Sequence, residues 1–389
     1  MRLFKKTLIA LYFSLCPLEM ALNIIFTSST KYVGILIFTV WVAEIIYNKD
    51  TLSFNGWKHI MMLLAWMAYG LIITLTIGMT SNRTYEYIVT YLMMTMLVVI
   101  CSQEEWAKRD INLFLYTYYL GSIIMAIIAI VYGNNVYEGR STIIIMGHYC
   151  DPNQLSASIL PGVFIGFEES IKEDGFIKKS GHLLAMMIVI YGILLTGSRG
   201  ALLGLLVGLT ILLSVQIISG KLRLYQIVIL IIGAIIILRT LPTLTLDRLR
   251  YSDIYLNGSG RSKIWEILIS SFDAKWILGH GIGSSISYFL DYYGKASAVH
   301  NTFLLVLYES GFIGLTMFVF MLLDLLINMI KSKNGLIAAI LAGAMVNAFF
   351  LDSLNLRYLW NGIIFSIIQY NAFNCDGTNI VENRFKYIR

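Results

Sequence analysis

The chain of 389 residues is poor in charge, because Asp, Glu, Lys and Arg together make up only 13% of it. A soluble globular domain usually carries about 25% charged residues. Hydrophobic residues reach 58% and recur in long runs along the sequence. This composition excludes an ordinary soluble domain and predicts a protein whose surface faces lipid or neighbouring helices.

Proline and cysteine are scarce too, with four of each. Few prolines suit long helices, because proline removes a helical hydrogen bond. The cysteines lack metal-ligand spacing, and we expect three of them in spans or on the cytoplasmic side, which argues against a disulfide framework. The basic start, Met1 to Lys6, resembles that of a signal peptide, but no small-residue cleavage site follows. We therefore expect the first apolar run to be an anchored helix.

The apolar runs predict an all-α, polytopic integral membrane protein with about twelve transmembrane helices, since one crossing needs about 20 apolar residues. Residues 1–389 are expected to form a single transmembrane domain. We detect no internal repeat. The expected spans are 7–27, 32–47, 59–79, 85–101, 111–132, 153–168, 182–196, 199–219, 223–239, 301–330, 335–353 and 357–373.

The distribution of positive charge predicts the orientation, because cytoplasmic loops of membrane proteins carry an excess of Lys and Arg. With the N-terminus inside, seventeen of the 29 Lys and Arg residues fall on the inner side, and the five short outer loops carry one each. Both termini are therefore expected in the cytoplasm. Inner positions favour Lys and outer positions favour Arg, whose guanidinium binds phosphate oxygens in pairs.

One outer loop is long, running over residues 240–300 between the ninth and tenth expected spans. Loops of that length are uncommon unless they are functional or disordered. Its segment from Ser262 to Asp273 places four apolar residues on one helical face, Ile264, Trp265, Leu268 and Phe272. We expect an amphipathic helix lying on the outer leaflet. The loop has nearly balanced charges and no basic patch, so nucleic acid is not an expected partner.

An apolar stretch of roughly 36 residues, from Leu183 to Ile218, is interrupted by Thr196-Gly197-Ser198-Arg199-Gly200. It must cross the membrane twice, which places Arg199 in a tight outer hairpin at a helix N-terminus. Backbone N–H groups and the positive end of the helix dipole favour anions there.

Three further polar signatures are expected on the outer side. Arg140 precedes Asp151-Pro152-Asn153, which reads as a helix N-cap followed by a first-turn proline. Arg261 begins Gly-Arg-Ser-Lys-Ile-Trp, and Gly279-His280-Gly281-Ile282-Gly283 follows it. His300-Asn301 stands at the start of the tenth span. If these helix N-termini are adjacent, their dipoles and arginines converge on a site that suits a pyrophosphate.

These motifs together resemble the O-antigen ligase and O-antigen polymerase family of bacterial surface polysaccharide assembly, of the Wzy-like kind. The matching elements are Gly139-Arg140 with Asp151-Pro152-Asn153, the Thr-Gly-Ser-Arg-Gly hairpin, Gly-Arg-x-x-x-Trp, Gly-x-Gly-x-Gly and His300-Asn301. They span about residues 139–315, and the earlier spans match only in being hydrophobic. His280 is a departure, because such proteins usually have an apolar residue there.

The resemblance implies a membrane glycosyltransferase of GT-C-like architecture that takes its glycan from undecaprenyl pyrophosphate and needs no metal or other cofactor. By matched position, Arg199 and Arg261 would hold the pyrophosphate, and His300 would be the catalytic base. We expect the remaining candidates to help bind substrate, namely Arg140, Asn301, Asp151 and Asn153. Preorganised cations would stabilise the leaving pyrophosphate, and a histidine of near-neutral pKa can accept the proton of a sugar hydroxyl.

Structural readings of the same residues stay open. Arg199 could be a hairpin charge, Arg261 a lipid-headgroup anchor and His300 an interface residue. Asp151 and Asn153 are more readily helix caps and packing residues. Glu309 lies nine residues beyond His300 and so faces elsewhere, which predicts a buried, hydrogen-bonded carboxyl group.

Three functions compete. The first is a polymerase for O-antigen or capsule, which transfers a growing glycan from undecaprenyl pyrophosphate to a new lipid-linked repeat unit. The second is an O-antigen ligase that transfers the glycan to lipid A core of lipopolysaccharide or to another acceptor. The third is a transporter or flippase for the lipid-linked unit, but charge signatures at one face favour an enzyme over a transporter.

The resemblance also implies a place in the cell and a set of partners. The expected place is the bacterial cytoplasmic membrane, with the active site facing outside. Besides the lipid-linked oligosaccharide and the bilayer itself, a chain-length regulator and a flippase are candidate partners.

Overall fold

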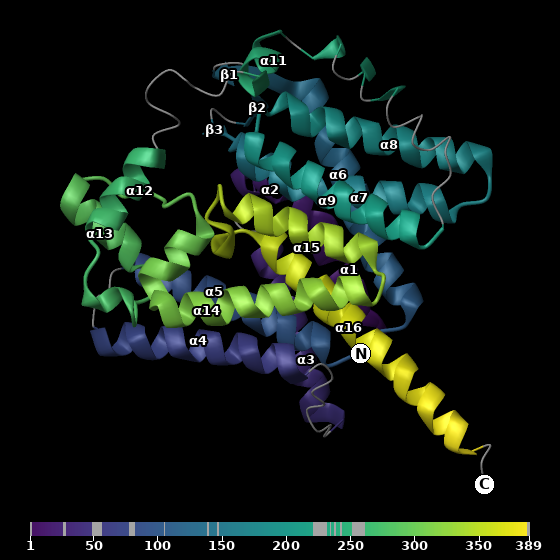
Figure 1. Ribbon diagram of the computed structural model, residues 1–389, viewed down its shortest axis with the longest axis horizontal. Coiled ribbons are helices and arrows are strands. Elements are labelled where there is room, and N and C mark those ends of the chain that lie inside the picture. Colours follow the sequence, from purple (N-terminus) through teal and green to yellow (C-terminus); the bar gives the residue numbers. More distant parts are fainter. Residues whose placement is uncertain are drawn as a thin grey trace.

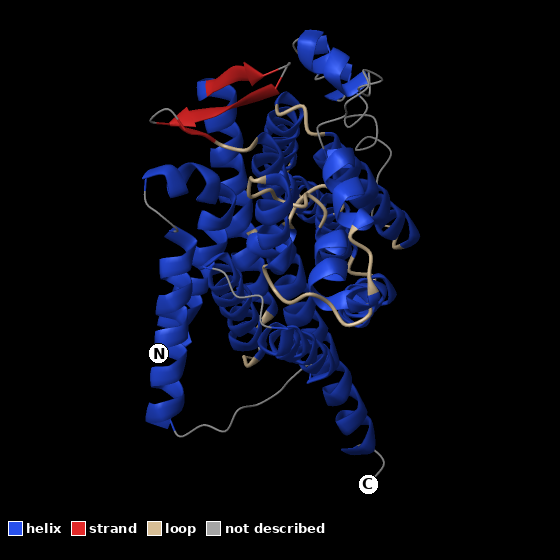
Figure 2. Ribbon diagram, turned by 90° about the vertical axis from the view of Figure 1, so that its left-hand side faces the viewer, coloured by secondary structure: helices blue, strands red, loops and turns tan. Residues whose placement is uncertain are grey.

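The computed structural model of the protein describes residues 2–25, 29–48, 57–77, 82–104, 106–137, 140–145, 148–220 and 261–386, with parts of 232–250 between the last two ranges. These residues form a bundle of long helices with a small sheet at its edge (Figures 1 and 2). Helices of the N-terminal part are α1 (Arg2–Leu15), α2 (Glu19–Ile25), α3 (Ser29–Asn48), α4 (Trp57–Ile77), α5 (Asn82–Ser102) and α6 (Lys108–Tyr132).

The rest of the bundle follows a short β segment. Its helices are α7 (Pro152–Lys172), α8 (Phe176–Leu195), α9 (Arg199–Ile218), α11 (Thr243–Arg250), α12 (Arg261–Ser270), α13 (Ser284–Tyr293), α14 (Thr302–Lys331), α15 (Gly335–Ala348) and α16 (Arg357–Lys386). Short 3-10 turns lie at η1 (Cys16–Leu18), η2 (Ala274–Trp276) and η3 (Ser353–Asn355).

The structure confirms a mostly helical, polytopic membrane protein. By length and composition, seven helices of the described part could cross a membrane: α3, α4, α5, α6, α8, α9 and α14. Helix α15 is apolar but shorter. Described helices occupy every expected span except 223–239, most of which lies outside the described residues. The count of twelve crossings therefore stays a prediction.

Two expected spans have different boundaries. The first, at 7–27, is not one helix, because η1 separates α1 from α2. Pro17 lies in the first positions of that turn, and its missing N–H cannot continue the helical ladder. The span expected at 335–353 ends at Ala348, and Asp352 stands in the turn before η3 instead of inside a helix.

An antiparallel sheet departs from the all-α prediction. Its strands pair in the order β1 (Gly133–Tyr137), β2 (Arg140–Ile145) and β3 (His148–Tyr149). Strand β2 contains Thr142 followed by three isoleucines, and β-branched side chains favour extended backbone. The sheet lies at the same end of the bundle as α12 and α13 (Figure 1). We call this end the capped end.

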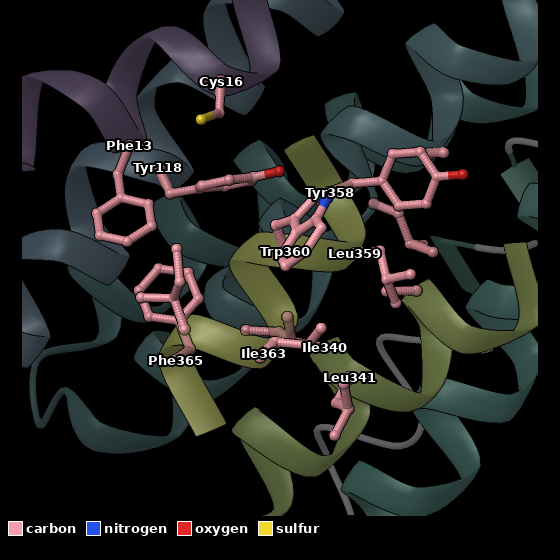
Figure 3. Close-up of a cluster of buried hydrophobic side chains, with 14 of the residues drawn as sticks. Phe13, Cys16, Tyr118, Ile340, Leu341, Tyr358, Leu359, Trp360, Ile363 and Phe365 are labelled. Carbon is pink, nitrogen blue, oxygen red and sulfur yellow. The ribbon is translucent and has the colours of Figure 1, made fainter. Parts of the chain in front are cut away.

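The centre of the bundle is tightly packed around α16. Phe13 of α1 stacks on Phe365 of α16 with ring centroids 4.5 Å apart, and Trp360 is fully buried beside them. Figure 3 shows these side chains meeting Ile340 and Leu341 of α15 and Tyr118 of α6. The core thus joins N-terminal and C-terminal helices in one body.

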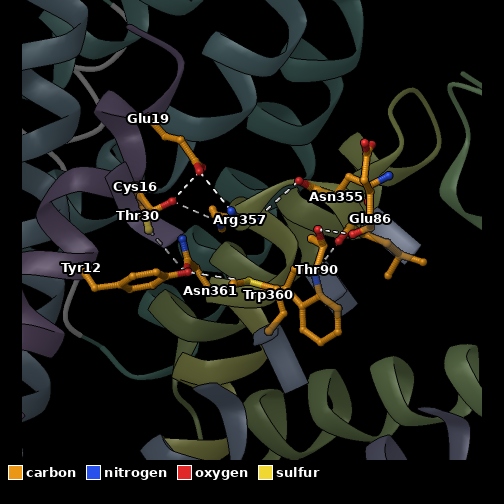
Figure 4. A network of polar contacts seen from close by, with 12 residues as sticks. Tyr12, Cys16, Glu19, Thr30, Glu86, Thr90, Asn355, Arg357, Trp360 and Asn361 are labelled. Carbon is orange, nitrogen blue, oxygen red and sulfur yellow. Dashed lines mark hydrogen bonds and ion pairs between the residues drawn. The ribbon is translucent and has the colours of Figure 1, made fainter. Parts of the chain in front are cut away.

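A buried polar network fixes the start of α16 against the N-terminal helices (Figure 4). The Arg357 guanidinium lies 3.3 Å from a carboxylate oxygen of Glu19 and donates to the hydroxyl of Thr30 at the same distance. Thr30 also donates to Glu19. A buried arginine needs such partners, because an unpaired charge is costly away from water. The network anchors the turn that precedes α16.

Candidate functional site

The N-terminus of α7 is capped as its sequence predicts. Asp151 accepts hydrogen bonds from the backbone N–H groups of Asn153 and Gln154, at 2.7 and 3.2 Å, and Pro152 occupies the first turn. Arg140 of β2 donates to the side-chain oxygen of Asn153 at 2.6 Å and to the carbonyl of Thr196 at 3.2 Å. Arg140 therefore ties the start of α7 to the hairpin between α8 and α9.

The predicted hairpin is present between α8 and α9. Gly197 adopts a φ of 60°, a left-handed conformation that glycine reaches without steric cost. Ser198 caps α9 by accepting a hydrogen bond from the Ala201 N–H at 3.4 Å. Arg199 is the first residue of α9 and is half-buried. The hairpin thus presents a guanidinium at a helix N-terminus, as expected.

His300 sits in a strained turn immediately before α14. Its φ of 55° is left-handed, which is uncommon for a residue other than glycine and marks sites that the surroundings must hold in place. Asn301 caps α14 by accepting from the Leu304 N–H at 3.0 Å. The side-chain oxygen of Asn301 is therefore engaged in the cap, and its predicted contact with substrate would fall to the amide nitrogen.

Asp352 holds this turn from the other side. Its carboxylate accepts the Asn301 N–H at 3.2 Å, and the backbone N–H groups of Val299 and His300 lie close enough to act on its pKa. Burial raises the pKa of Asp352 to about 6, although these backbone donors and the charge of Arg261 act in the opposite direction. No sequence motif pointed to this residue, because Asp352 was expected inside the eleventh span, at 335–353.

Arg261, the first residue of α12, is brought towards His300 by the docking of its helix. Trp265 of the same helix donates from its indole nitrogen to the Val299 carbonyl at 2.8 Å. Burial and the positive charge of Arg261 lower the pKa of His300 below its ordinary value, while Asp151 acts in the opposite direction. His300 is thereby favoured as the neutral imidazole, which can accept a proton.

The apolar face of α12 differs from its expected location. Leu268 is fully buried, and Ile264, Trp265 and Ile267 pack with it against Trp276, Phe289, Val299, Leu305 and Tyr308. This face therefore covers protein, where we expected it to lie on the outer leaflet. The remaining apolar residues Ile269 and Phe272 stay exposed.

The glycine run after α12 braces a kink in α14. Gly311 has a φ of 65° inside that helix, so the carbonyls of Tyr308 and Glu309 lose their helical donors. The N–H groups of His280 and Gly281 replace them at 3.0 and 2.9 Å. A Cβ at Gly279 would lie 2.4 Å from the Glu309 carbonyl oxygen, so this close approach requires glycine.

His280 and Glu309, which the sequence analysis noted, pack where the glycine run meets α14. The His280 ring stacks on Tyr308 with centroids 4.2 Å apart. Glu309 is buried and accepts a hydrogen bond from Ser285 at 2.9 Å, which confirms the expectation of a buried, bonded carboxyl group. Both residues connect α14 to residues 261–301, which we call the outer segment after the side of the membrane on which the sequence predicts them.

Packing brings the N-termini of α7, α9 and α14 to the capped end. Helix α9 packs along α15, α7 packs on α8, α9 and α15, and α14 packs on α15. The turn after α15 connects them, since Phe350 lies against Gly200 and the Thr302 hydroxyl donates to the Leu351 carbonyl at 2.6 Å. Three positive dipole ends, Arg199, Arg261 and a neutral histidine thus share one end of the fold, an arrangement able to bind a phosphate and accept a proton.

Across the described ranges, no group of three or more His, Cys, Asp or Glu side chains is arranged to hold a metal ion. The cysteines Cys16, Cys101 and Cys150 are free and buried.

Comparison with known proteins gives one family. Residues 184–319 match the family model described as O-antigen ligase, which confirms the resemblance that the motifs predicted. No curated protein matches the chain. Among solved structures, a chain from "Structural coordination of polymerization and crosslinking by a peptidoglycan synthase complex" aligns with a TM-score of 0.44 and 15% identity, covering 82% of this chain and 99% of that one. Nothing about this chain's fold or function follows from a likeness at that level.

Proposed function

We propose that this chain, which matches the O-antigen ligase family over residues 184–319, is a polysaccharide polymerase of the bacterial cytoplasmic membrane. It would transfer a growing O-antigen or capsule glycan from undecaprenyl pyrophosphate to the end of a lipid-linked repeat unit, at the outer face of the membrane. The observation that carries the proposal is the left-handed turn at His300, which Asp352 holds through the Asn301 N–H and against which the helix that begins with Arg261 docks through Trp265.

In the proposed reaction, His300 removes the proton from the acceptor hydroxyl as its oxygen attacks the anomeric carbon of the donor. The bond between that carbon and the pyrophosphate oxygen breaks, and the electron pair leaves with the pyrophosphate. Arg199 and Arg261 would stabilise the charge that develops there, with help from the α9 dipole. A general base of this kind contributes about 10²–10⁴-fold.

The support for each substrate-binding residue differs. Arg199 and Arg261 stand at helix N-termini, where anions bind readily. Arg140, Asp151 and Asn153 contact one another or the backbone, which supports a role in shaping the pocket. Asn301 and Asp352 fix the backbone of His300, so we assign them to positioning the base.

The family description favours a second candidate, a ligase that transfers finished glycan to lipid A core or another acceptor. The two reactions share the donor and the residues and differ in the acceptor. A transporter for the lipid-linked unit is the alternative from another class, and it would release no free undecaprenyl pyrophosphate.

The test is reconstitution of the purified protein with undecaprenyl-pyrophosphate-linked repeat units. A polymerase will yield lengthened lipid-linked glycan and free undecaprenyl pyrophosphate from the repeat units alone, and the reaction will persist in EDTA because the proposed mechanism uses no metal. Product that appears only when lipid A core is added would identify a ligase. Movement of intact donor across the bilayer without release of pyrophosphate would identify a transporter.

A further inference from the structure

Helix α13 carries a row of tyrosines that the proposed chemistry does not use. Tyr288 and Tyr292 are four residues apart, on one face of the helix, and their rings stack with centroids 5.6 Å apart and planes 15° apart. Tyr292 is 67% exposed and the neighbouring Tyr293 is 48% exposed. The rings of Tyr292 and Tyr293 are therefore accessible at the surface, and the Tyr288 ring stacks on that of Tyr292.

This surface is firmly connected to the His300 turn. Phe289 of α13, which lies between Tyr292 and Tyr293 around the helix, is buried in the same cluster as Val299 and Tyr308. The Tyr288 ring lies 5.8 Å from the Tyr308 ring, and its hydroxyl donates to the Ile267 carbonyl of α12 at 3.4 Å. In Figure 1, α12 and α13 lie side by side near one end of α14. The tyrosines thus belong to the rigid unit that also holds the base.

Charged side chains of both signs lie near the rings, and the exposed Leu290 is an apolar neighbour on the same helix. The Lys263 ammonium lies 5.8 Å from the centre of the Tyr293 ring, and Asp291 is exposed between the tyrosines on α13. Sugar rings present an apolar C–H face beside hydroxyl groups, so they suit flat aromatic surface flanked by hydrogen-bonding side chains. A lipid chain would favour a continuous aliphatic surface, and a nucleic acid would favour excess positive charge.

We propose that Tyr288, Tyr292 and Tyr293 form a stacking platform for the sugar rings of the glycan substrate. We call these three residues the tyrosine platform. The inference rests on the proposed function, since it identifies where the glycan beyond the reacting sugar would lie. The platform would hold the glycan in register while Lys263 and Asp291 bind its hydroxyl groups, so longer glycans would bind better than single sugars.

Two measurements test the platform. The first is saturation-transfer NMR on the full-length protein in lipid nanodiscs, with the repeat-unit oligosaccharide released from its lipid carrier as the probe. The second is the KM for lipid-linked repeat unit in the transfer assay. The variants are Tyr292→Ala and the double change Tyr292→Ala with Tyr293→Ala, with Tyr292→Trp as the variant that keeps a ring. Tyr132→Ala is the matched control, because Tyr132 is 68% exposed and ends α6, outside the α12–α13 segment.

We expect Tyr292→Ala to raise KM about 3- to 10-fold with kcat nearly unchanged, as the loss of one aromatic contact would. The double variant will lose the saturation transfer, whereas Tyr292→Trp and Tyr132→Ala will keep it. If the double variant keeps both the KM and the NMR signal, the platform is wrong, although transfer by the unaltered protein would still support the proposed function.

Two other outcomes separate the two proposals. The tyrosines could instead be interface residues that anchor the protein in the bilayer, as aromatic belts do. In that case Tyr292→Ala would lower the amount of inserted protein and leave KM unchanged, which would overturn the platform. If the unaltered protein binds the oligosaccharide through these rings but transfers nothing, the platform stands and the proposed enzyme function fails.

Discussion

At the scale of single residues, the site depends on how a histidine is kept neutral and in a left-handed turn. Burial and Arg261 disfavour the imidazolium form of His300, and Asp352 accepts the N–H of the next residue, Asn301, at 3.2 Å. An unpaired buried donor costs about 1–3 kcal/mol, so Asp352 stabilises a conformation that the chain would otherwise leave. The base is therefore set by residues that are distant in the sequence.

The first residue-scale prediction concerns Arg199. We expect Arg199→Lys to abolish most transfer activity while the protein still accumulates in the membrane. Lysine keeps the charge but cannot bind two phosphate oxygens in a planar fork. Polymer length in cells and the amount of membrane-inserted protein would be measured together. Near-normal polymer in the lysine variant would show that Arg199 serves only as an anchor.

The second residue-scale prediction concerns how the transfer rate depends on pH. Because the pKa of His300 lies below its ordinary value and that of Asp352 is about 6, we expect kcat/KM to fall as pH drops below about 6. Protonation then removes the base and weakens the acceptor that holds its turn. Removing the charge of Arg261 raises both pKa values, so Arg261→Gln should move the acid limb of its residual activity to higher pH.

Arg261→Lys is the control for this shift, since it keeps the positive charge. Its acid limb should stay close to that of the unaltered protein, even if its rate is lower. An acid limb at the same pH in both variants would show that Arg261 does not set the protonation of the site.

The sequence identified most of the candidate residues at this scale and missed those whose role depends on tertiary contact. Arg199, Asp151 and Asn301 stand at helix starts with recognisable capping patterns. Asp352 lies 51 residues from the N–H group that it accepts, and nothing in its local sequence indicates that contact. The hydrogen bond from Trp265 to the Val299 carbonyl could not be predicted for the same reason.

At the scale of elements, the kinked α14 and its glycine brace position the outer segment. The prediction here is that Gly279→Ala lowers both thermal stability and activity. A Cβ would meet the Glu309 carbonyl at 2.4 Å, and the φ of 107° disfavours any side chain. Such backbone strain costs of order 1–3 kcal/mol.

The matched control is Gly181→Ala in α8, where a Cβ would meet no atom within 4 Å. Alanine is a better helix former than glycine, so this variant should keep its unfolding temperature and activity or gain slightly in stability. Detergent-solubilised protein would be compared by fluorescence-monitored thermal unfolding. Equal effects of the two substitutions would mean that the close approach at Gly279 does not support the fold.

Elements were predicted best where a long apolar run stood alone. The hairpin at Gly197 and helix α9 follow the expected limits closely, whereas α8 begins at Phe176, before the expected start at residue 182. Hydropathy could not show that η1 divides the first span or that α15 stops at Ala348, because apolar residues continue through both turns. The three strands between Gly133 and Tyr149 were not predicted either, because they are short and pair only with one another.

At the scale of the whole molecule, the account depends on the orientation of the capped end. The positive-inside bias predicts that this end lies outside the cytoplasm. We expect an impermeant thiol reagent to label Lys295→Cys, but not Lys331→Cys, in intact cells with the outer membrane permeabilised. Both side chains are exposed; Lys295 lies shortly before α14 begins and Lys331 lies at its end. The variants are made in a background without the four native cysteines, which removes other labelling. Labelling at Lys331→Cys alone would invert the topology and with it the proposed site of transfer.

The central claim is that His300 is the base and not a ligand of the pyrophosphate. The most direct test measures donor binding and transfer side by side for purified His300→Ala in nanodiscs with lipid-linked repeat unit. We predict a loss of about 10²–10⁴-fold in transfer rate with the dissociation constant of the donor nearly unchanged, because Arg199 and Arg261 remain. A variant that loses donor binding in parallel with activity would make His300 a phosphate ligand, and one that keeps full turnover would contradict the assignment altogether.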